Sequence, residues 1–187
     1  QPPETHNLVG NIRALKEMIR TYVGHDLDLY GTEQGFATGG DQGKEFSQAL
    51  WLTRSYLIML GEGFKVNFAF YFADYPNEPG YGFFHNLNPR IPFGTDAVSP
   101  KPMAASYAAL TMMLEGHKSV GAIEWLGRTA LGYALERKGQ VTLALWDYGD
   151  SPRVVKLPVG VESVDVFDWM GNPATVKTPG GTLTLTL

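Results

Sequence analysis

The order of helix-like and strand-like segments in the first 119 residues limits the possible folds more than any other feature. Apolar residues recur at three- and four-residue steps over 8–23, 44–60 and 103–114, which predicts three amphipathic helices. Between them, 27–33 and 64–72 are short apolar runs bounded by turn residues, as buried strands are. This alternation predicts two parallel strands joined by crossover helices.

The remaining residues, 120–187, follow a different pattern. They show no helical periodicity and contain six short β-type runs, at 123–126, 130–136, 141–146, 154–157, 164–168 and 183–187. Turn-forming segments separate several of these runs, which is typical of an antiparallel sandwich or meander. We therefore expect an α/β unit at 1–119, followed by an all-β unit at 120–187. Between the second strand and the third helix, 73–98 is rich in Pro and Gly and predicts a long loop.

Composition excludes several classes of function. The chain of 187 residues has no Cys, which rules out disulfides, thiolate zinc sites and a thiol nucleophile. The net charge is −4 without a basic run, so we expect no nucleic-acid partner. No apolar run reaches the roughly 18 residues of a membrane span, so we expect no membrane insertion. The four His are far apart and no phosphate-binding glycine motif is present, so we expect no metal and no cofactor.

The sharpest candidate for chemistry is Glu33, at the C-terminal end of the first predicted strand. In parallel α/β folds the C-terminal strand ends face the active site, where a carboxylate serves as nucleophile, base or metal ligand. Strand alternation places Gly31 on the same face as Glu33. The alternative is a structural Glu that caps the next helix or pairs with a surface Arg.

Several segments, taken in order, carry a family resemblance. They are LYGTEQGF, QALWLTRSYLIMLGEG, FKVNFAFYFADYP, YGFFHNLNP, SPKPMAASYAAL and, later, VTLALWDYG and VDVFDWMGNP. The series resembles the last third of the retaining (β/α)8-barrel glycoside hydrolases of the two-glutamate clan, clan A. The resemblance implies a partial (β/α) barrel, made of the seventh and eighth strands with their helices, followed by a small antiparallel β-sandwich.

The same resemblance implies roles for individual residues. In that family the seventh strand ends in a Thr-Glu pair whose Glu is the nucleophile, and Glu33 follows Thr32 here. Residues at or beyond the two strand ends would line the sugar subsite; these are Gln34, Phe36, Tyr71, Asp74, Tyr75 and Tyr81. Most other rings of the second strand are expected to be core.

The second catalytic carboxylate of the family has no good counterpart. The family carries it in an Asn-Glu pair on the fourth strand, upstream of the nucleophile. Asn77-Glu78-Pro79 looks like that pair, but Glu78 follows Glu33 by 45 residues and lies in a Pro/Gly loop. We interpret Glu78 as a surface residue; the alternative is a loop acid that reaches the site. The acid/base residue is then expected on missing N-terminal sequence or on a partner chain.

Length leads to the same expectation. A complete barrel takes roughly 250 residues, and only 119 are of barrel type here. The first hypothesis is the C-terminal portion of a retaining glycoside hydrolase, acting on a carbohydrate and completed by an N-terminal barrel fragment or by other copies. The start at Gln1 without Met fits a piece of something longer. The alternative is a non-catalytic carbohydrate-binding or structural module derived from such an enzyme.

Overall fold

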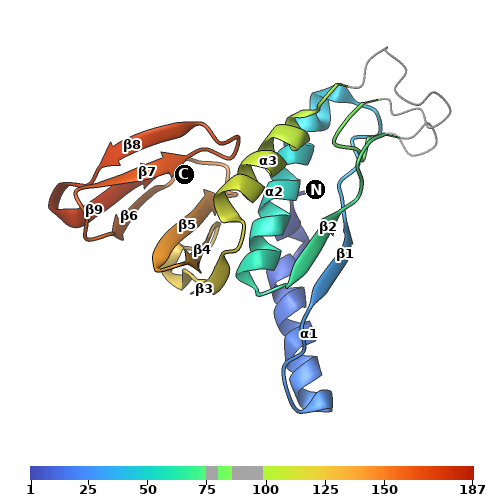
Figure 1. Ribbon diagram of the computed structural model, residues 1–187, viewed down its shortest axis with the longest axis horizontal. Helices are drawn as coiled ribbons and strands as arrows, with labels where there is room; N and C mark the ends of the chain where they lie inside the picture. The colour runs from blue at the N-terminus through green and yellow to red at the C-terminus, as the bar shows by residue number, and fades with distance from the viewer. Residues whose placement is uncertain (75–79, 86–98) are drawn as a thin grey trace.

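The computed structural model describes residues 1–74, 80–85 and 99–187, and combines helices with several small sheets (Figure 1). Its N-terminal elements are α1 (Leu8–Val23), β1 (Tyr30–Gln34), α2 (Glu45–Gly61), β2 (Val66–Ala69) and α3 (Pro102–Leu114). The three predicted helices are confirmed to within a residue. Both predicted strands are present, although each is shorter than its apolar run. The part of Ala73 to Val98 that the structure describes contains no helix or strand of this series.

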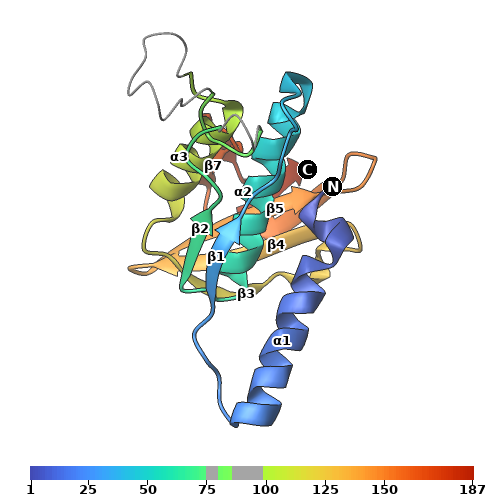
Figure 2. The same cartoon turned by 90° about the vertical axis from the view of Figure 1, so that its right-hand side faces the viewer.

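β1 and β2 form a two-stranded parallel sheet, with Tyr30 opposite Val66 and Gly31 opposite Asn67. Gly31 is buried, and a Cβ there would lie 3.6 Å from Cε of Met59 on α2. The α2 helix therefore covers one face of the sheet, and α3 lies next to α2 (Figure 2).

The opposite face of this sheet is open. Tyr30 and Phe68 are each 58% exposed, and Phe72 just beyond β2 is 64% exposed. The expectation of two buried strands is therefore wrong for this chain. A parallel sheet is buried only when both of its faces are covered, and here the described helices cover one.

α2 lies at the centre of the molecule. Ala49, Leu52 and Ile58 are almost fully buried, and they belong to one core cluster with Met103 of α3 and Tyr133 of the C-terminal half. Close packing of α2 on that half explains Gly61, because a Cβ there would lie 2.2 Å from the Tyr133 ring. Side chains this close cannot both fit, so glycine is required.

A charged cluster joins the same elements at the end of α2. Glu62 is 7% exposed and accepts hydrogen bonds from Arg13 of α1, at 3.0 Å from Nη2, and from the Tyr133 hydroxyl, also at 3.0 Å. The hydrogen bond to Glu62 raises the pKa of Arg13. Burial is the main reason that the pKa of Tyr133 is raised, and the Glu62 carboxylate adds to it. The cluster therefore holds α1, α2 and the C-terminal half together.

The C-terminal half contains three small antiparallel sheets. β3 (Lys118–Ala122), β4 (Ala130–Arg137) and β5 (Gln140–Asp147) form one; β6 (Val154–Pro158) pairs with β9 (Thr182–Thr186), and β7 (Ser163–Phe167) pairs with β8 (Pro173–Lys177). A second core cluster lies here, built on Leu126, Ala130, Val155, Leu157 and Leu183. Five of the six predicted strand runs are confirmed.

Two details of the C-terminal half differ from the prediction. The run at 123–126 is wrong as a strand: Glu124–Leu126 is a 3₁₀ helix. The strands β3 and β8 were not predicted, because each has few large apolar side chains, and β8 begins at Pro173, a residue more typical of turns. β3 crosses the expected boundary between residues 119 and 120, and the division into two units stays a prediction.

No helix in the described part of the chain is both long and apolar enough to cross a bilayer.

Candidate functional site

The loops that follow β1 and β2 meet at the C-terminal edge of the parallel sheet. The Phe70 amide donates to the Gln34 carbonyl at 2.8 Å, which continues the strand pairing beyond β2. The Thr38 amide donates to the Gly80 carbonyl at 3.1 Å, so the two loops also contact each other farther out. The Phe83 amide donates to the Phe72 carbonyl at 3.0 Å. Residues 80–85 are therefore fixed against both strand ends.

Glu33 lies on β1 one residue before its end, and its side chain is exposed. The register of β1 against β2 is irregular between Gly31 and Gln34. Gly31 is buried while Thr32 and Glu33 are both exposed, so the strict alternation expected along this strand is wrong at this point. Among residues 1–74, 80–85 and 99–187, no hydrogen bond or ion pair engages the Glu33 side chain. The alternative roles, capping a helix or pairing with an Arg, are thus not seen.

Two of the expected subsite residues come together as an aromatic pair. The rings of Tyr71 and Tyr81 stack with centroids 6.1 Å apart and planes inclined by 28°. Phe70 meets both rings edge-on, at 4.4 Å from Tyr71 and 5.5 Å from Tyr81. Both tyrosines are partly exposed, and the Phe70–Tyr71 peptide bond is cis. The pair offers a partly exposed aromatic surface at the end of β2.

Gly35 allows the end of β1 to approach this pair. A Cβ at Gly35 would lie 2.3 Å from the Phe70 carbonyl oxygen and 3.1 Å from Cδ1 of Tyr81. Real Cβ atoms essentially never come as close as 2.3 Å to a backbone oxygen, so any other residue would push the two strand ends apart. The glycine after Gln34 therefore sets the distance between the Glu33 end of β1 and the tyrosine pair.

Asp74 is a candidate subsite residue whose two carboxylate oxygens are already engaged. Oδ1 accepts from the amides of Gly80 at 2.9 Å and Gly82 at 2.7 Å. Oδ2 accepts from Nζ of Lys101 at 2.5 Å, and the Lys101 side chain is only 1% exposed. In this structure Asp74 positions the loop that carries Tyr81.

The other predicted subsite residues divide into three groups. Phe36 packs edge-on against Trp51 at 5.9 Å and borders the core cluster, so its ring is used in packing. Gln34 is partly exposed beside Glu33. Tyr75 lies outside the described residues, and so does the Asn77-Glu78-Pro79 segment.

Three residues contribute to the site that sequence reasoning had not assigned to it. Lys101 is the buried partner of Asp74. Gln48 is 1% exposed, and its Nε2 donates to the carbonyls of Phe36 and Gly80 and so links the two loops. Glu45 lies 3.3 Å from Nε2 of His85. A lysine between two prolines and a glutamine on an apolar helix face were the signals present in the sequence.

Among the described residues, no group of three or more His, Asp or Glu side chains is placed to hold a metal ion. Acidic residues near the β turns serve local structure instead. Asp147 pairs with Arg153, and Oδ1 of Asp168 accepts from the amides of Met170 and Asn172, both at 2.9 Å. The site at the sheet edge thus consists of an exposed carboxylate on β1 and an aromatic pair beyond the end of β2, with buried polar contacts that hold the two loops.

Comparison with known proteins links this fold to glycoside hydrolases. No protein-family model and no curated protein sequence matches the chain. Among solved structures, the fold is similar to part of a family 39 glycoside hydrolase from the gut symbiont Bacteroides cellulosilyticus WH2. The TM-score is 0.70 at 20% sequence identity, over 94% of this chain. The chain spans 36% of the length of that protein. At this identity, the likeness establishes the fold.

Proposed function

We propose that this chain is the C-terminal portion of a retaining glycoside hydrolase, with Glu33 as its catalytic nucleophile. The observation that carries the proposal is the structural likeness to a glycoside hydrolase over 94% of the chain. Support at the site comes from Glu33, an exposed carboxylate at a strand end that no described side chain engages. The aromatic pair of Tyr71 and Tyr81 would stack on a sugar ring, and Gln34 would hydrogen-bond its hydroxyls.

The proposed reaction needs two carboxyl groups. The Glu33 carboxylate attacks the anomeric carbon, the glycosidic C–O bond breaks, and a carboxylic acid about 5–5.5 Å away protonates the leaving oxygen. The same second group then removes a proton from water, which attacks the anomeric carbon of the glycosyl ester and releases Glu33 with the configuration retained. We place this acid/base residue outside the 187 residues, on an N-terminal barrel segment or on another copy.

The proposed architecture is a partial (β/α) barrel followed by a sandwich. β1 and β2 would be its seventh and eighth strands, and the sheets formed by β3–β9 would be the sandwich. The exposed aromatic face of the parallel sheet, with Tyr30 and Phe68, supports a missing barrel wall, because a two-stranded parallel sheet with one covered face is not a stable unit.

A mechanism-based label tests the nucleophile without needing the acid. Glycosyl fluorides with fluorine at C2 form long-lived glycosyl esters, and fluoride leaves without protonation. The chain is incubated with a panel of such fluorides that covers the common sugars. We expect one of them to attach a single fluorosugar to the peptide that contains Glu33. E33Q should not be labelled, whereas E17Q on the exposed side of α1 should be labelled like the wild type. Labelling of another carboxylate would exclude Glu33 as nucleophile.

The second candidate function is a non-catalytic carbohydrate-binding module. It is favoured by the presence of one candidate carboxylate at the described site, where hydrolysis needs two. Native mass spectrometry with oligosaccharides separates the two functions. A binding module would hold a sugar with E33Q as tightly as with the wild type, would lose it with Y81A, and would form no adduct with any fluoride.

A further inference from the structure

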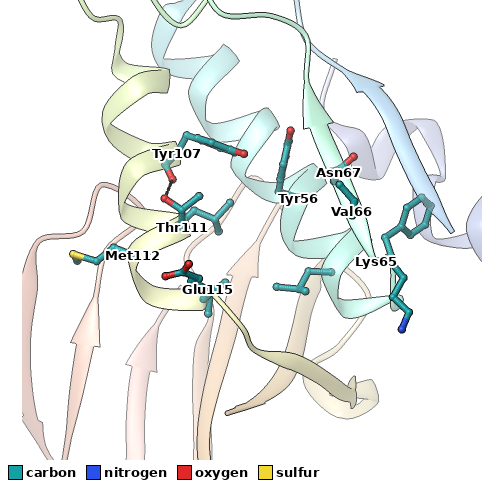
Figure 3. Close-up of a pocket in the computed structure, with 12 residues that line it drawn as sticks. Tyr56, Lys65, Val66, Asn67, Tyr107, Thr111, Met112 and Glu115 are labelled. Atoms are coloured by element: carbon teal, nitrogen blue, oxygen red, sulfur yellow. Dashed lines mark hydrogen bonds between the residues drawn. The ribbon is translucent and has the colours of Figure 1, made fainter. Parts of the chain in front are cut away.

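The helix α3 presents two different faces to the rest of the molecule. Tyr107 and Thr111 line a groove of about 530 Å³ between β2, α2 and α3, on the side of the parallel sheet (Figure 3). Ala109 lies two residues from each of them on the helix, so it faces another way. The turn between β7 and β8 packs there, since a Cβ at Gly171 would lie 2.8 Å from Cβ of Ala109. This turn is therefore held against the helices on the side away from the parallel sheet (Figure 1).

The same turn carries an aromatic side chain that meets α2. Trp169 contacts Phe46 edge to face, with ring centroids 6.3 Å apart and planes inclined by 83°. Phe46 is 62% exposed, whereas Leu50 and Trp51 on the next turn of α2 are partly buried. Trp169 is partly exposed. The two rings, which we call the Phe46–Trp169 corner, thus present an aromatic surface to solvent.

The turn that carries Trp169 is held in place by its own hydrogen bonds. Oδ1 of Asp168 accepts from the amides of Met170 and Asn172, each at 2.9 Å, and Oδ2 accepts from the Asn172 side-chain amide at 2.7 Å. Gly171 completes the turn with a φ of 88°, which other residues rarely adopt. A surface that is already ordered loses little conformational entropy when a ligand binds, so this arrangement favours binding.

The chemistry of the corner suits a sugar. The faces of aromatic rings are electron-rich, and the C–H bonds on one face of a pyranose are apolar and weakly positive, so the two surfaces stack. Within the described part of the chain, no hydrogen bond engages Nε1 of Trp169 or Oδ1 of Asn172, which leaves a donor and an acceptor on this turn for sugar hydroxyls. A protein partner fits less well, because a stable interface buries roughly 800 Å² per partner and two rings supply a small part of that area.

The corner lies at the same end of α2 as the candidate site. Glu45 contacts His85 and Gln48 links the two loops of that site, whereas Phe46 projects from a different side of the helix than Gln48. We infer that the Phe46–Trp169 corner is a second carbohydrate-binding site, which takes one sugar residue of an oligosaccharide or polysaccharide chain. Two sugar sites at one end of the molecule favour a chain over a single sugar. The inference rests on the proposed function for the chemical class of its ligand.

Electrophoresis of the intact chain in native gels that contain a soluble polysaccharide tests this inference, because binding slows migration. The polysaccharides are hydroxyethylcellulose, xylan, galactomannan and arabinan. The comparison is made in Y81A, which lacks one ring of the candidate site, so that a sugar held there does not hide the effect. We expect Y81A to be slowed by at least one polysaccharide, and F46A/Y81A to bind it about tenfold more weakly. F46Y/Y81A keeps the ring and should bind like Y81A, and so should W125A/Y81A, which removes a ring that is 60% exposed elsewhere.

Four results would overturn the inference. They are the absence of slowed migration for wild type and Y81A alike, binding by wild type that Y81A abolishes, equal binding by Y81A and F46A/Y81A, and an equal loss in W125A/Y81A. The second of these would assign the bound polysaccharide to the candidate site instead. Labelling of Glu33 by a fluoride does not involve Phe46 or Trp169, so failure of that labelling and failure of polysaccharide binding at the corner are separate results.

Discussion

Replacing Asp74 with Asn tests whether a buried ion pair positions the loop at the sheet edge. Asn keeps an oxygen for the amides of Gly80 and Gly82 but removes the negative charge next to Lys101. The Lys101 side chain is 1% exposed, so its ammonium group would remain buried without a counter-charge. Breaking a buried pair in this way costs about 3–5 kcal/mol of unfolding free energy.

The reverse substitution, Lys101→Met, should be milder. Asp74 keeps its two backbone donors, and its side chain is 14% exposed, so water reaches part of it. We expect a loss of about 1–3 kcal/mol for K101M. The double variant D74N/K101M should be more stable than D74N alone, because no uncompensated charge is then buried.

Urea unfolding of the full chain, followed by tryptophan fluorescence, measures these differences. For a chain of this size, each kcal/mol lowers the melting temperature by roughly 2–4 °C, so D74N should melt about 6–20 °C lower. The matched control is D28N, since Asp28 and Lys65 form an exposed pair with 58% and 59% of their side chains accessible. Its effect should stay below about 1 kcal/mol. If D74N unfolds like D28N, or the double variant shows no coupling, the reasoning is refuted.

Two further predictions concern the C-terminal half. G61A should destabilise the chain by about 1–3 kcal/mol in urea unfolding, because the new Cβ would overlap the Tyr133 ring; an unchanged midpoint would contradict the packing of α2 on β4. The pKa of Asp168 is lowered mainly by the hydrogen bond from the Asn172 side-chain amide, and hydrogen bonds from backbone amides lower it further. The ionised Asp168 carboxylate therefore stabilises the fold above about pH 3.9, and this stabilisation is lost as the pH falls through the lowered pKa. The stability difference between wild type and D168A should therefore shrink below about pH 4, and a constant difference from pH 7 to 3 would contradict it.

The three helices were predictable because their signals are local. Periodic apolar residues mark each helix, and Gly24 ends α1 in a left-handed conformation with φ of 84°. The five confirmed β runs were found for the same reason. β3 was missed because Lys118–Ala122 holds little apolar surface, and its pairing depends on β4, which comes later in the chain.

The site was predictable in part. The end of β1 was predicted to within one residue. Its irregular register changes which side chains share a face, and no periodicity in the sequence encodes that irregularity. Asp74 and Lys101 are 27 residues apart, so their contact exists only after residues 80–85 fold back between them. Long-range polar contacts of this kind depend on the tertiary structure and leave no spacing pattern.

The central position of α2 affects what a break in the chain would do. Tyr133, Leu135 and Trp146 belong to the same buried cluster as Ala49 and Leu52. A protease that cut between α3 and β4 would therefore leave two pieces with complementary apolar surfaces, held also by Glu62. We expect the pieces to elute together as a non-covalent complex, so the two halves of this chain could be separated genetically only at the cost of solubility.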